Sequence, residues 1–281
     1  MIRIITTADD YGMSQAINEA IIDCINNGTL TSVNVMVNMP FLNSDIKDKK
    51  RISIGIHWNL TIGKCVADKN DVSSLVDENG SFFPYETFKK RIKKGLVKKS
   101  HILVELEAQF QRFCSIFGYA PKYWNTHQNI VLLPKISSCF FKTGKRLEIE
   151  YTRTFCRKYI DYESLSFKRR IREFFVRIFV NYMFNVKFSF CSKTPNYREI
   201  VFNRKNKNDL NLMDAMLSKC KKNKSVEIVY HPSKRIDCDS FGTIGKERID
   251  EYIFLTTNKN NLFEILNKHD AKLVSFDEIK N

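Results

Sequence analysis

Residues 1–12 read MIRIITTADDYG, and this stretch decides how the rest of the chain is interpreted. Its isoleucines form a short, β-branched apolar run, which is typical of a buried strand. The run ends in two adjacent carboxylates, Asp9 and Asp10, and a helix-like stretch follows in which Ser14 is the expected N-cap. We therefore expect the acid pair at the carboxyl end of a strand, where α/β folds place their ligands.

The two adjacent carboxylates have two interpretations. On a regular strand successive side chains point to opposite sides, so Asp9 and Asp10 can take different roles. In the first interpretation one of them holds a metal ion while its neighbour accepts a proton. In the second, both belong to a solvated turn and cap the helix that follows.

The composition is that of a protein that can bury a core. The chain has 281 residues, is 43% apolar and contains only 6 prolines, so it is not disordered in bulk. At this length the chain can form one large α/β domain or two smaller ones, and we expect a single domain over residues 1–281. A transmembrane run is not present, and Asp9 and Asp10 interrupt any signal-peptide core. The 8 cysteines lack a Cys-x-x-Cys pair, which indicates reduced thiols in a cytoplasmic protein.

The positive charge is concentrated in one part of the sequence. The formal net charge is +15, and residues 140–205 hold sixteen Lys and Arg against six Asp and Glu. A basic patch of this kind indicates an acidic partner, such as phosphate, anionic lipid, nucleic acid or an acidic glycan.

Strand-like stretches alternate with helix-like stretches along the whole chain, without a hairpin signal. This order predicts an α/β fold with a parallel sheet, and the length and the strand count favour a barrel-like arrangement. After the first strand, the expected strands cover residues 31–38, 52–60, 123–133, 149–155, 226–233 and 272–276, and the clearest helix covers 102–117.

A basic, aromatic-rich insertion at residues 160–200 contains a helical pattern over residues 167–184. One interpretation is a surface helix that packs a broad apolar face on the core. The other is a lid or a membrane-surface element near the site. For the second, the expected basic contacts are Arg169, Arg170, Arg172 and Arg177, and the expected apolar ones are Phe174, Phe175, Ile178 and Phe179.

Three histidines lie at expected strand ends, as the acid pair does. His57 points away from the isoleucines of its strand, and His127 and His231 close the strand-like stretches near them. In a barrel these ends meet at one face. One carboxylate and two imidazoles make a three-ligand metal set with room for water, which leaves a second carboxylate as base. For His57 a hydrogen-bonded structural role is the alternative.

The ordered set of motifs resembles the YdjC-like carbohydrate deacetylases of the ChbG and HpnK type. The resemblance spans nearly the whole chain, and it rests on Ala8-Asp9-Asp10-Tyr11-Gly12, Asn18-Glu19-Ala20-Ile21, Thr31-Ser32, Asn38, Gly55-Ile56-His57-Trp58-Asn59-Leu60-Thr61, Thr126-His127-Gln128, Arg153, His231-Pro232 and Arg248-x-x-Glu251.

The resemblance implies a TIM-like (β/α) barrel with seven strands or irregular closure. It also implies a hydrolase that removes the acetyl group of an N-acetylated sugar and releases acetate. The sugar is expected in an oligosaccharide, a glycolipid or a lipid-linked form. Carried over by position, Asp9 is the proton acceptor, and Asp10, His57 and His127 hold one divalent ion. The family is usually assigned Mg²⁺, whereas two imidazoles and a carboxylate suit Zn²⁺ or another transition ion by softness.

The remaining site residues follow less directly from the resemblance. His231 is the expected acid for the leaving amine, with Arg153 as its charge partner. Substrate-binding roles are expected for Tyr11, Asn59 and Asn125.

The chain departs from the family pattern at several positions. Asn125 stands where the family usually has an acid, and Asn129 stands where it has a second histidine. An amide at Asn125 removes a charge that would support the metal site. Residues 160–200 do not follow the family pattern either.

Two other functions compete with deacetylation. A metal-dependent phosphoesterase on a similar barrel fits the basic excess, and a non-catalytic binder of an acidic polymer would use the basic segment. The chain contains no recognisable nucleic-acid module, so nucleic acid is not an expected partner. The sequence is compatible with a homodimer and with peripheral contact at the inner membrane face through residues 167–184.

Overall fold

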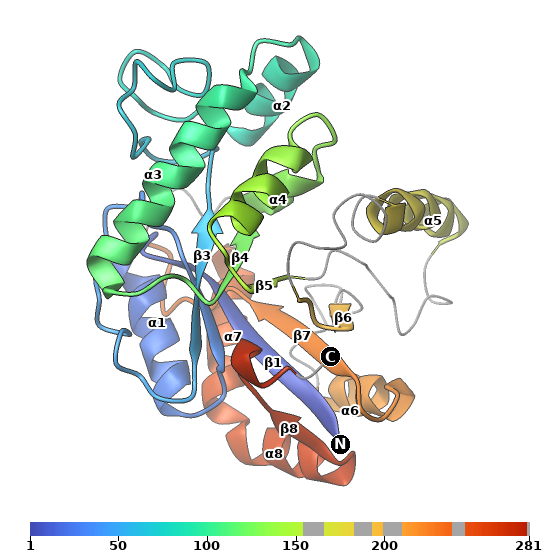
Figure 1. Ribbon diagram of the computed structural model, residues 1–281. Helices are drawn as coiled ribbons and strands as arrows, with labels where there is room; N and C mark the ends of the chain where they lie inside the picture. Colours follow the sequence, from blue (N-terminus) through green and yellow to red (C-terminus); the bar gives the residue numbers. More distant parts are fainter. Residues whose placement is uncertain (154–165, 183–192, 199–209, 238–244, 280–281) are drawn as a thin grey trace.

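The computed structural model describes residues 1–153, 166–182, 193–198, 210–237 and 245–279 (Figure 1). The strands are β1 (Ile2–Tyr11), β2 (Ser32–Val35), β3 (Ser53–Trp58), β4 (Tyr123–Thr126), β5 (Tyr151–Thr152), β6 (Tyr197–Arg198), β7 (Ser225–Tyr230) and β8 (Ala271–Leu273). The α-helices are α1 (Gln15–Asn26), α2 (Tyr85–Lys93), α3 (Lys99–Phe117), α4 (Ser137–Arg146), α5 (Phe167–Asn181), α6 (Leu210–Lys219), α7 (Gly245–Thr257) and α8 (Lys259–Lys268).

The strands form one parallel sheet that curls into an open barrel. Seven of them follow the order β5-β4-β3-β2-β1-β7-β6, and β8 pairs with β1 beside this path. A parallel bridge from Tyr151 to Lys193 links the β5 edge to the segment that leads into β6. Figure 1 shows α1, α3, α4, α7 and α8 around the outside of the curl. The expected α/β fold with a parallel sheet is confirmed, and the barrel remains open.

Local signals place the ends of the helices that flank the sheet. The Ser14 side chain accepts a hydrogen bond from the backbone of Ile17 at 3.2 Å, which makes it the N-cap of α1 as expected. At the C-terminus of α3, Gly118 adopts φ = 77°. Glycine takes this left-handed conformation without a steric cost, so the helix can end there in a sharp turn.

Several strands are shorter than their apolar patterns predict. The stretch 123–133 stops being a strand at Thr126 and continues as a 3₁₀ turn, η1 (His127–Leu132). Gln128 and Asn129 have φ values of 51° and 53°, which a strand cannot accommodate. Of the predicted strand 149–155 only β5 is formed, and residues 154 and 155 lie outside the described residues. The pattern also missed α4, α6 and β6.

The inner face of the curled sheet is arranged in layers. Alternate residues of a strand share a face. On β1, β4 and β5 the lower row on this face consists of Ile5, Tyr123 and Tyr151. The row above it consists of Asp9, Asn125 and Arg153, which directly follows β5. A second, small core cluster forms the apolar layer: Ile5, Tyr123, Tyr151, Val274, Phe276 and Ile279. The polar layer above it is therefore held on a packed support at the carboxyl ends of the strands.

Among the described residues, no helix is long and apolar enough to cross a membrane. The cysteines that the structure describes at positions 24, 65, 114, 139 and 220 are free thiols. Of the predicted insertion 160–200, the structure describes residues 166–182 and 193–198.

We predict that Gly55→Ala destabilises the fold by about 1–3 kcal/mol, because overpacking a close-packed core costs that much. A Cβ at Gly55 would lie 2.5 Å from the ring of Tyr123, which itself stacks on Phe276 at 4.0 Å between ring centroids. Chemical denaturation measures the change. In a Tyr123→Leu background the same glycine substitution should cost clearly less, and an equal cost in both backgrounds would contradict this explanation.

Candidate metal centre

A β-bulge brings the two adjacent carboxylates into one site. In the pairing of β1 with β2, Ala8 lies opposite Val33 and Tyr11 lies opposite Val35, so Asp9 and Asp10 both face the single residue Asn34. Asp10 adopts φ = 74°, a conformation that Asp visits more readily than most residues. The expectation that Asp9 and Asp10 point to opposite sides was wrong. The extra residue of the bulge turns both into the barrel.

Asp10, His57 and His127 form a buried cluster with the geometry of a metal site. Asp10 Oδ1 lies 3.3 Å from His57 Nε2 and 3.1 Å from His127 Nδ1. One ligand atom from each residue lies within 4.8 Å of the others. With metal–ligand bonds of about 2.0–2.2 Å, two neighbouring ligand atoms lie roughly 3 Å apart. The donor types and their spacing therefore fit a single divalent ion held by these three side chains.

The amide of Asn125 orients His57 within this cluster. Asn125 Oδ1 contacts His57 Nδ1, and Asn125 Nδ2 lies 3.3 Å from Asp9 Oδ1. A rotation of the amide by 180° would instead let its nitrogen donate to His57 Nδ1. When His57 binds a metal through Nε2, its proton is on Nδ1 and must be donated to an oxygen. In the rotated orientation the amide oxygen would accept from both Nη atoms of Arg153 and from Asn34 Nδ2, so these buried donors favour the opposite orientation to the one that a metal ion on His57 Nε2 would favour.

A buried arginine holds Asp9 in a bidentate ion pair. Arg153 Nη1 and Nη2 each lie 2.8 Å from one oxygen of Asp9, and Arg153 Nε lies 2.9 Å from Glu227 Oε1. Asn34 Nδ2 also donates to Asp9 Oδ1 at 2.6 Å. Burial raises the pKa of Asp9, but the Arg153 charge and the nearby His57 more than offset it. The pKa of Asp9 is therefore well below its usual range, and the carboxylate is ionised.

A second buried arginine supports Asp10 from the opposite side. Arg248 Nη2 on α7 lies 2.5 Å from Asp10 Oδ2, the oxygen that does not face the histidines. Burial raises the pKa of Asp10, but Arg248 and then His127 lower it by more, so its pKa is also well below the usual range. Asp10 thus presents an ionised Oδ1 to the two imidazoles.

The charges of the site favour a bound cation. Asp9, Asp10 and Glu227 carry three negative charges against two on Arg153 and Arg248, so one negative charge is in excess. Burial lowers the pKa of His57, but Asp9 and then Asp10 raise it above its usual value. The carboxylates therefore attract an additional positive charge, which a divalent ion can supply.

His231 lies next to Asp9 but outside the cluster of three. Its Nε2 is 3.7 Å from Asp9 Oδ2, and its side chain is 19% exposed, whereas that of Asp9 is 3% exposed. The backbone N–H of His231 donates to Glu251 on α7, which fixes the chain just after β7. Arg153, expected as the partner of His231, forms its ion pairs with Asp9 and Glu227. His231 therefore approaches Asp9 from the side that is more accessible to solvent.

The expected substrate-binding residues occupy different surroundings. Tyr11 is fully buried in the hydrophobic core, and its hydroxyl donates to Asn43. Asn59 Nδ2 donates to Asn38 Oδ1 at 3.0 Å and to the Ile62 carbonyl at 2.7 Å, while its Oδ1 accepts from the Thr61 backbone at 3.0 Å. Asn59 thus shapes its own loop, and direct contact of these residues with a substrate stays a prediction. Asn125 lies in the site itself.

Sequence reasoning missed two residues that complete the site, Asn34 and Glu227, and gave two others no role. Asn34 and Glu227 are polar residues within otherwise apolar strand patterns, TSVNVMVN and VEIVY, and this interruption was the available signal. Arg248 and Glu251 were noticed as a motif, but nothing in the sequence indicated that they reach Asp10 and the backbone of His231.

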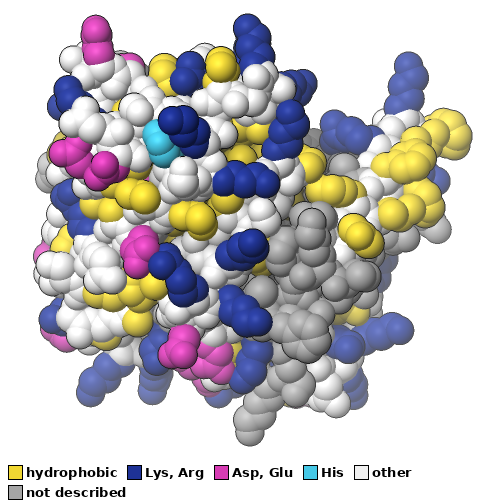
Figure 2. All heavy atoms as spheres, turned by 45° about the horizontal axis from the view of Figure 1, so that its top comes forward, with side chains coloured by type: hydrophobic (Ala, Val, Ile, Leu, Met, Phe, Trp, Pro, Cys, Tyr) yellow, Lys and Arg dark blue, Asp and Glu magenta, His cyan; other side chains and the backbone are white. Residues whose placement is uncertain are grey.

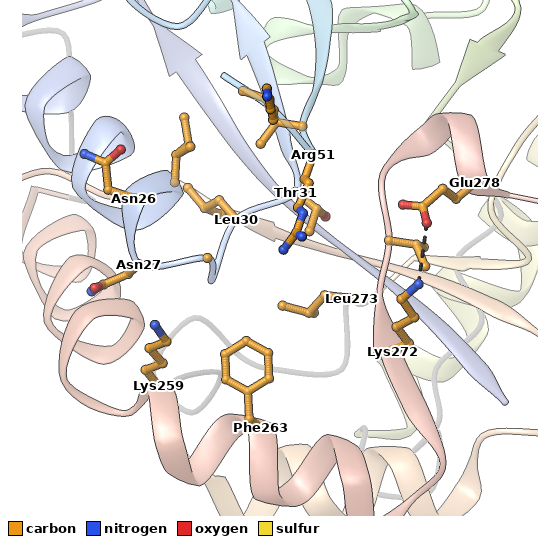
Figure 3. Close-up of a pocket in the computed structure, with 15 residues that line it drawn as sticks. Asn26, Asn27, Leu30, Thr31, Arg51, Lys259, Phe263, Lys272, Leu273 and Glu278 are labelled. Atoms are coloured by element: carbon orange, nitrogen blue, oxygen red, sulfur yellow. Dashed lines mark ion pairs between the residues drawn. The ribbon is translucent and has the colours of Figure 1, made fainter. Parts of the chain in front are cut away.

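A cavity of about 730 Å³ lies at the opposite end of the sheet from this cluster. It is lined by the starts of β2 and β3, the end of β8 and residues of α8. In Figure 3 the apolar side chains of Phe263 and Leu273 point into it, and Arg51 and Lys259 lie at its sides. The residues of the candidate metal centre do not line this cavity.

The open α/β barrel thus carries a buried Asp/His/His cluster at the carboxyl ends of its strands. A family model described as YdjC-like protein matches residues 3–263. The chain therefore belongs to the YdjC-like family, as its motifs predict.

Curated relatives carry deacetylase names. The chain is 29% identical over 154 residues to the carbohydrate deacetylase of Danio rerio, which covers 54% of this chain and 49% of the relative. It is 31% identical over 136 residues to the chitooligosaccharide deacetylase of Yersinia pestis, with coverages of 47% and 52%. The chain thus spans about half the length of the curated relatives it matches.

A crystal structure from Enterococcus faecalis V583 shares the fold. The crystallised protein is named for cellobiose-phosphate cleavage. The two structures superpose with a TM-score of 0.72 at 20% sequence identity, and the match covers 99% of both chains.

We predict that His57→Ala and His127→Ala each weaken zinc binding by about 100-fold or more, because each removes one of the three ligand side chains found among the described residues. Isothermal titration with Zn²⁺ measures the affinity. His231→Ala should keep the ion, since His231 faces Asp9. His269→Ala, which removes an imidazole that pairs with Asp214, is the matched control. Equal losses in all four variants would refute the assignment of ligands.

Proposed function

We propose that this protein is a metal-dependent hydrolase that removes the acetyl group from an N-acetylated sugar and releases acetate. One observation carries the proposal: an ionised, bidentately held Asp9 lies directly beside a buried Asp10/His57/His127 cluster. Membership of a family whose curated members are named carbohydrate deacetylases supports the choice of an amide as substrate.

The proposed substrate is an N-acetylated sugar in an oligosaccharide or in a lipid-linked form. Asp10, His57 and His127 would hold one divalent ion, and the two imidazoles favour Zn²⁺ or another transition ion over Mg²⁺. When bound, such an ion supplies Lewis acidity and makes water acidic enough to lose a proton to a weak base.

The proposed role of Asp9 follows from its contacts. Hydrolysis breaks the amide C–N bond, transfers the oxygen of water to the acyl carbon, and requires one proton to be removed from that water. Asp9 is ionised and held by Arg153, so an oxygen of its carboxylate is ready to take this proton. Arg153 and Asn34 prevent the carboxylate from turning away.

The proposed role of His231 is to deliver a proton to the leaving nitrogen. A free amine leaves only when it is protonated, and imidazole exchanges protons near neutral pH. His231 Nε2 lies 3.7 Å from Asp9 Oδ2, so the acid and the base face the same small volume. Glu251 holds the backbone of His231 at this position.

The test is acetate release from a panel of N-acetylated sugars, measured with and without a chelator. The proposal expects release that a chelator abolishes and that added Zn²⁺ restores. Release of phosphate from p-nitrophenyl phosphate with no acetate from any sugar would favour a phosphoesterase and overturn the proposal.

Asp9→Asn should keep the fold and the bound metal but lower the rate by about 10²–10⁴-fold, which is the usual contribution of a general base. The measurement is kcat for acetate release alongside metal content. Asp23→Asn is the matched control, because Asp23 pairs with Lys234 at the surface. If Asp9→Asn retains near-normal kcat, Asp9 is a structural residue.

Arg153→Met should shift the acidic limb of the pH–rate profile to higher pH. Arg153 holds the pKa of Asp9 below its usual range against the effect of burial, so its removal raises that pKa and protonates the base at a higher pH. Stability should also fall by about 3–5 kcal/mol, because buried Asp9 and Glu227 lose their partner.

Glu227→Gln serves as the comparison for Arg153→Met. It keeps the ion pair between Arg153 and Asp9, so its acidic limb should stay near that of the wild type. An unshifted acidic limb in Arg153→Met would show that Asp9 is not the group that must be ionised.

A further inference from the structure

Helix α5 turns a row of large apolar side chains toward solvent. The row consists of Phe167, Ile171, Phe174, Phe175, Ile178 and Tyr182, with exposures from 44% to 76%. At 3.6 residues per turn these six positions fall within an arc of about 100° on one side of the helix. Six of the 13 exposed large hydrophobic residues found in the described part of the chain therefore lie on this one face.

Basic residues border this apolar face on both sides. By the same helical geometry, Lys168 and Arg172 lie along one edge and Arg170 along the other. Lys168 and Arg172 are exposed, and Arg170 is half-buried. In Figure 2 hydrophobic and basic side chains gather together on the projection at the right of the molecule. An apolar stripe with cationic edges is the pattern of a helix that lies in a membrane interface.

One described side chain outside the exposed arc contacts the rest of the protein. Phe179, which lies outside the exposed arc, is half-buried and packs against the main hydrophobic core. Of the two interpretations of this helix, packing of its broad apolar face on the core is not found for Phe174, Phe175 and Ile178, whose side chains are exposed. Figure 1 shows α5 standing away from the sheet, on the side of β5 and β6. The apolar face is directed outward and can meet an external partner.

We propose that the apolar face of α5 docks the protein on an anionic lipid bilayer. The six apolar side chains would enter the interface while Lys168, Arg170 and Arg172 contact the lipid headgroups. The net charge of +15 adds long-range attraction to the same surface. This interaction goes beyond the proposed catalytic function and does not depend on it.

Charge favours a membrane over a second copy of the chain. In a two-fold symmetric dimer the same patch meets itself, so the cationic edges of both helices would lie against each other. Such contacts between like charges oppose association. An anionic bilayer offers the opposite charge together with an apolar interior, and so complements both features of the face.

The experiment is co-sedimentation of the full chain with vesicles of phosphatidylcholine, alone or with about a third phosphatidylserine. The proposal expects binding to the anionic vesicles that weakens as salt rises, since screening shortens the range of the attraction. Phe174→Ser/Phe175→Ser should abolish most binding. Lys168→Gln/Arg172→Gln should weaken it by about 25-fold, at roughly fivefold per charge.

Two control variants change the same residue types elsewhere on the surface. Leu96→Ser/Ile253→Ser removes exposed apolar side chains, and Lys221→Gln/Lys222→Gln removes basic ones. Both should bind like the wild type. The proposal is overturned if anionic vesicles fail to bind the protein even at low salt, if the controls lose as much binding as the α5 variants, or if light scattering shows a dimer that Phe174→Ser/Phe175→Ser dissociates.

Discussion

The structure depends on the burial of two adjacent carboxylates in one place. The side chains of Asp9 and Asp10 are each at most 3% exposed, and their charges would repel strongly if nothing opposed them. Arg153 from the end of β5 and Arg248 from α7 each bind one of them. Breaking a buried ion pair of this kind costs about 3–5 kcal/mol. The curl of the sheet and the position of α7 therefore depend on these two acids.

The same constraint assigns different surroundings to the two acids. The bulge opposite Asn34 turns both side chains inward, and the two arginines then approach from opposite sides. Asp9 is surrounded by donors that keep it ionised and fixed, whereas Asp10 offers one oxygen to His57 and His127. The apolar layer around Tyr123 and Phe276 supports these groups from below. One local irregularity in β1 thus separates a candidate base from a candidate metal ligand.

The sequence was sufficient to predict the parallel α/β fold and the convergence of Asp10, His57 and His127, because strand ends of a parallel sheet share one edge. It could not predict the bulge, since the extra residue falls at the end of β1, after the apolar run whose alternation would reveal it. Asn34 and Glu227 were missed because a lone polar residue in a strand does not reveal its partner. The exposure of α5 was also beyond the sequence, because an amphipathic pattern is the same whether its apolar face meets the core or solvent.

The central claim is that the bulged end of β1 and the ends of β3 and β4 assemble one metal centre. Anomalous diffraction from zinc-soaked crystals, recorded at the zinc absorption edge, tests it most directly. The account predicts one strong peak within about 2.3 Å of a ligand atom of Asp10, His57 and His127, while the Arg153–Asp9 ion pair stays intact. A zinc peak bound through Asp9 and His231 instead, or an empty Asp10/His57/His127 cluster under saturating zinc, would contradict it.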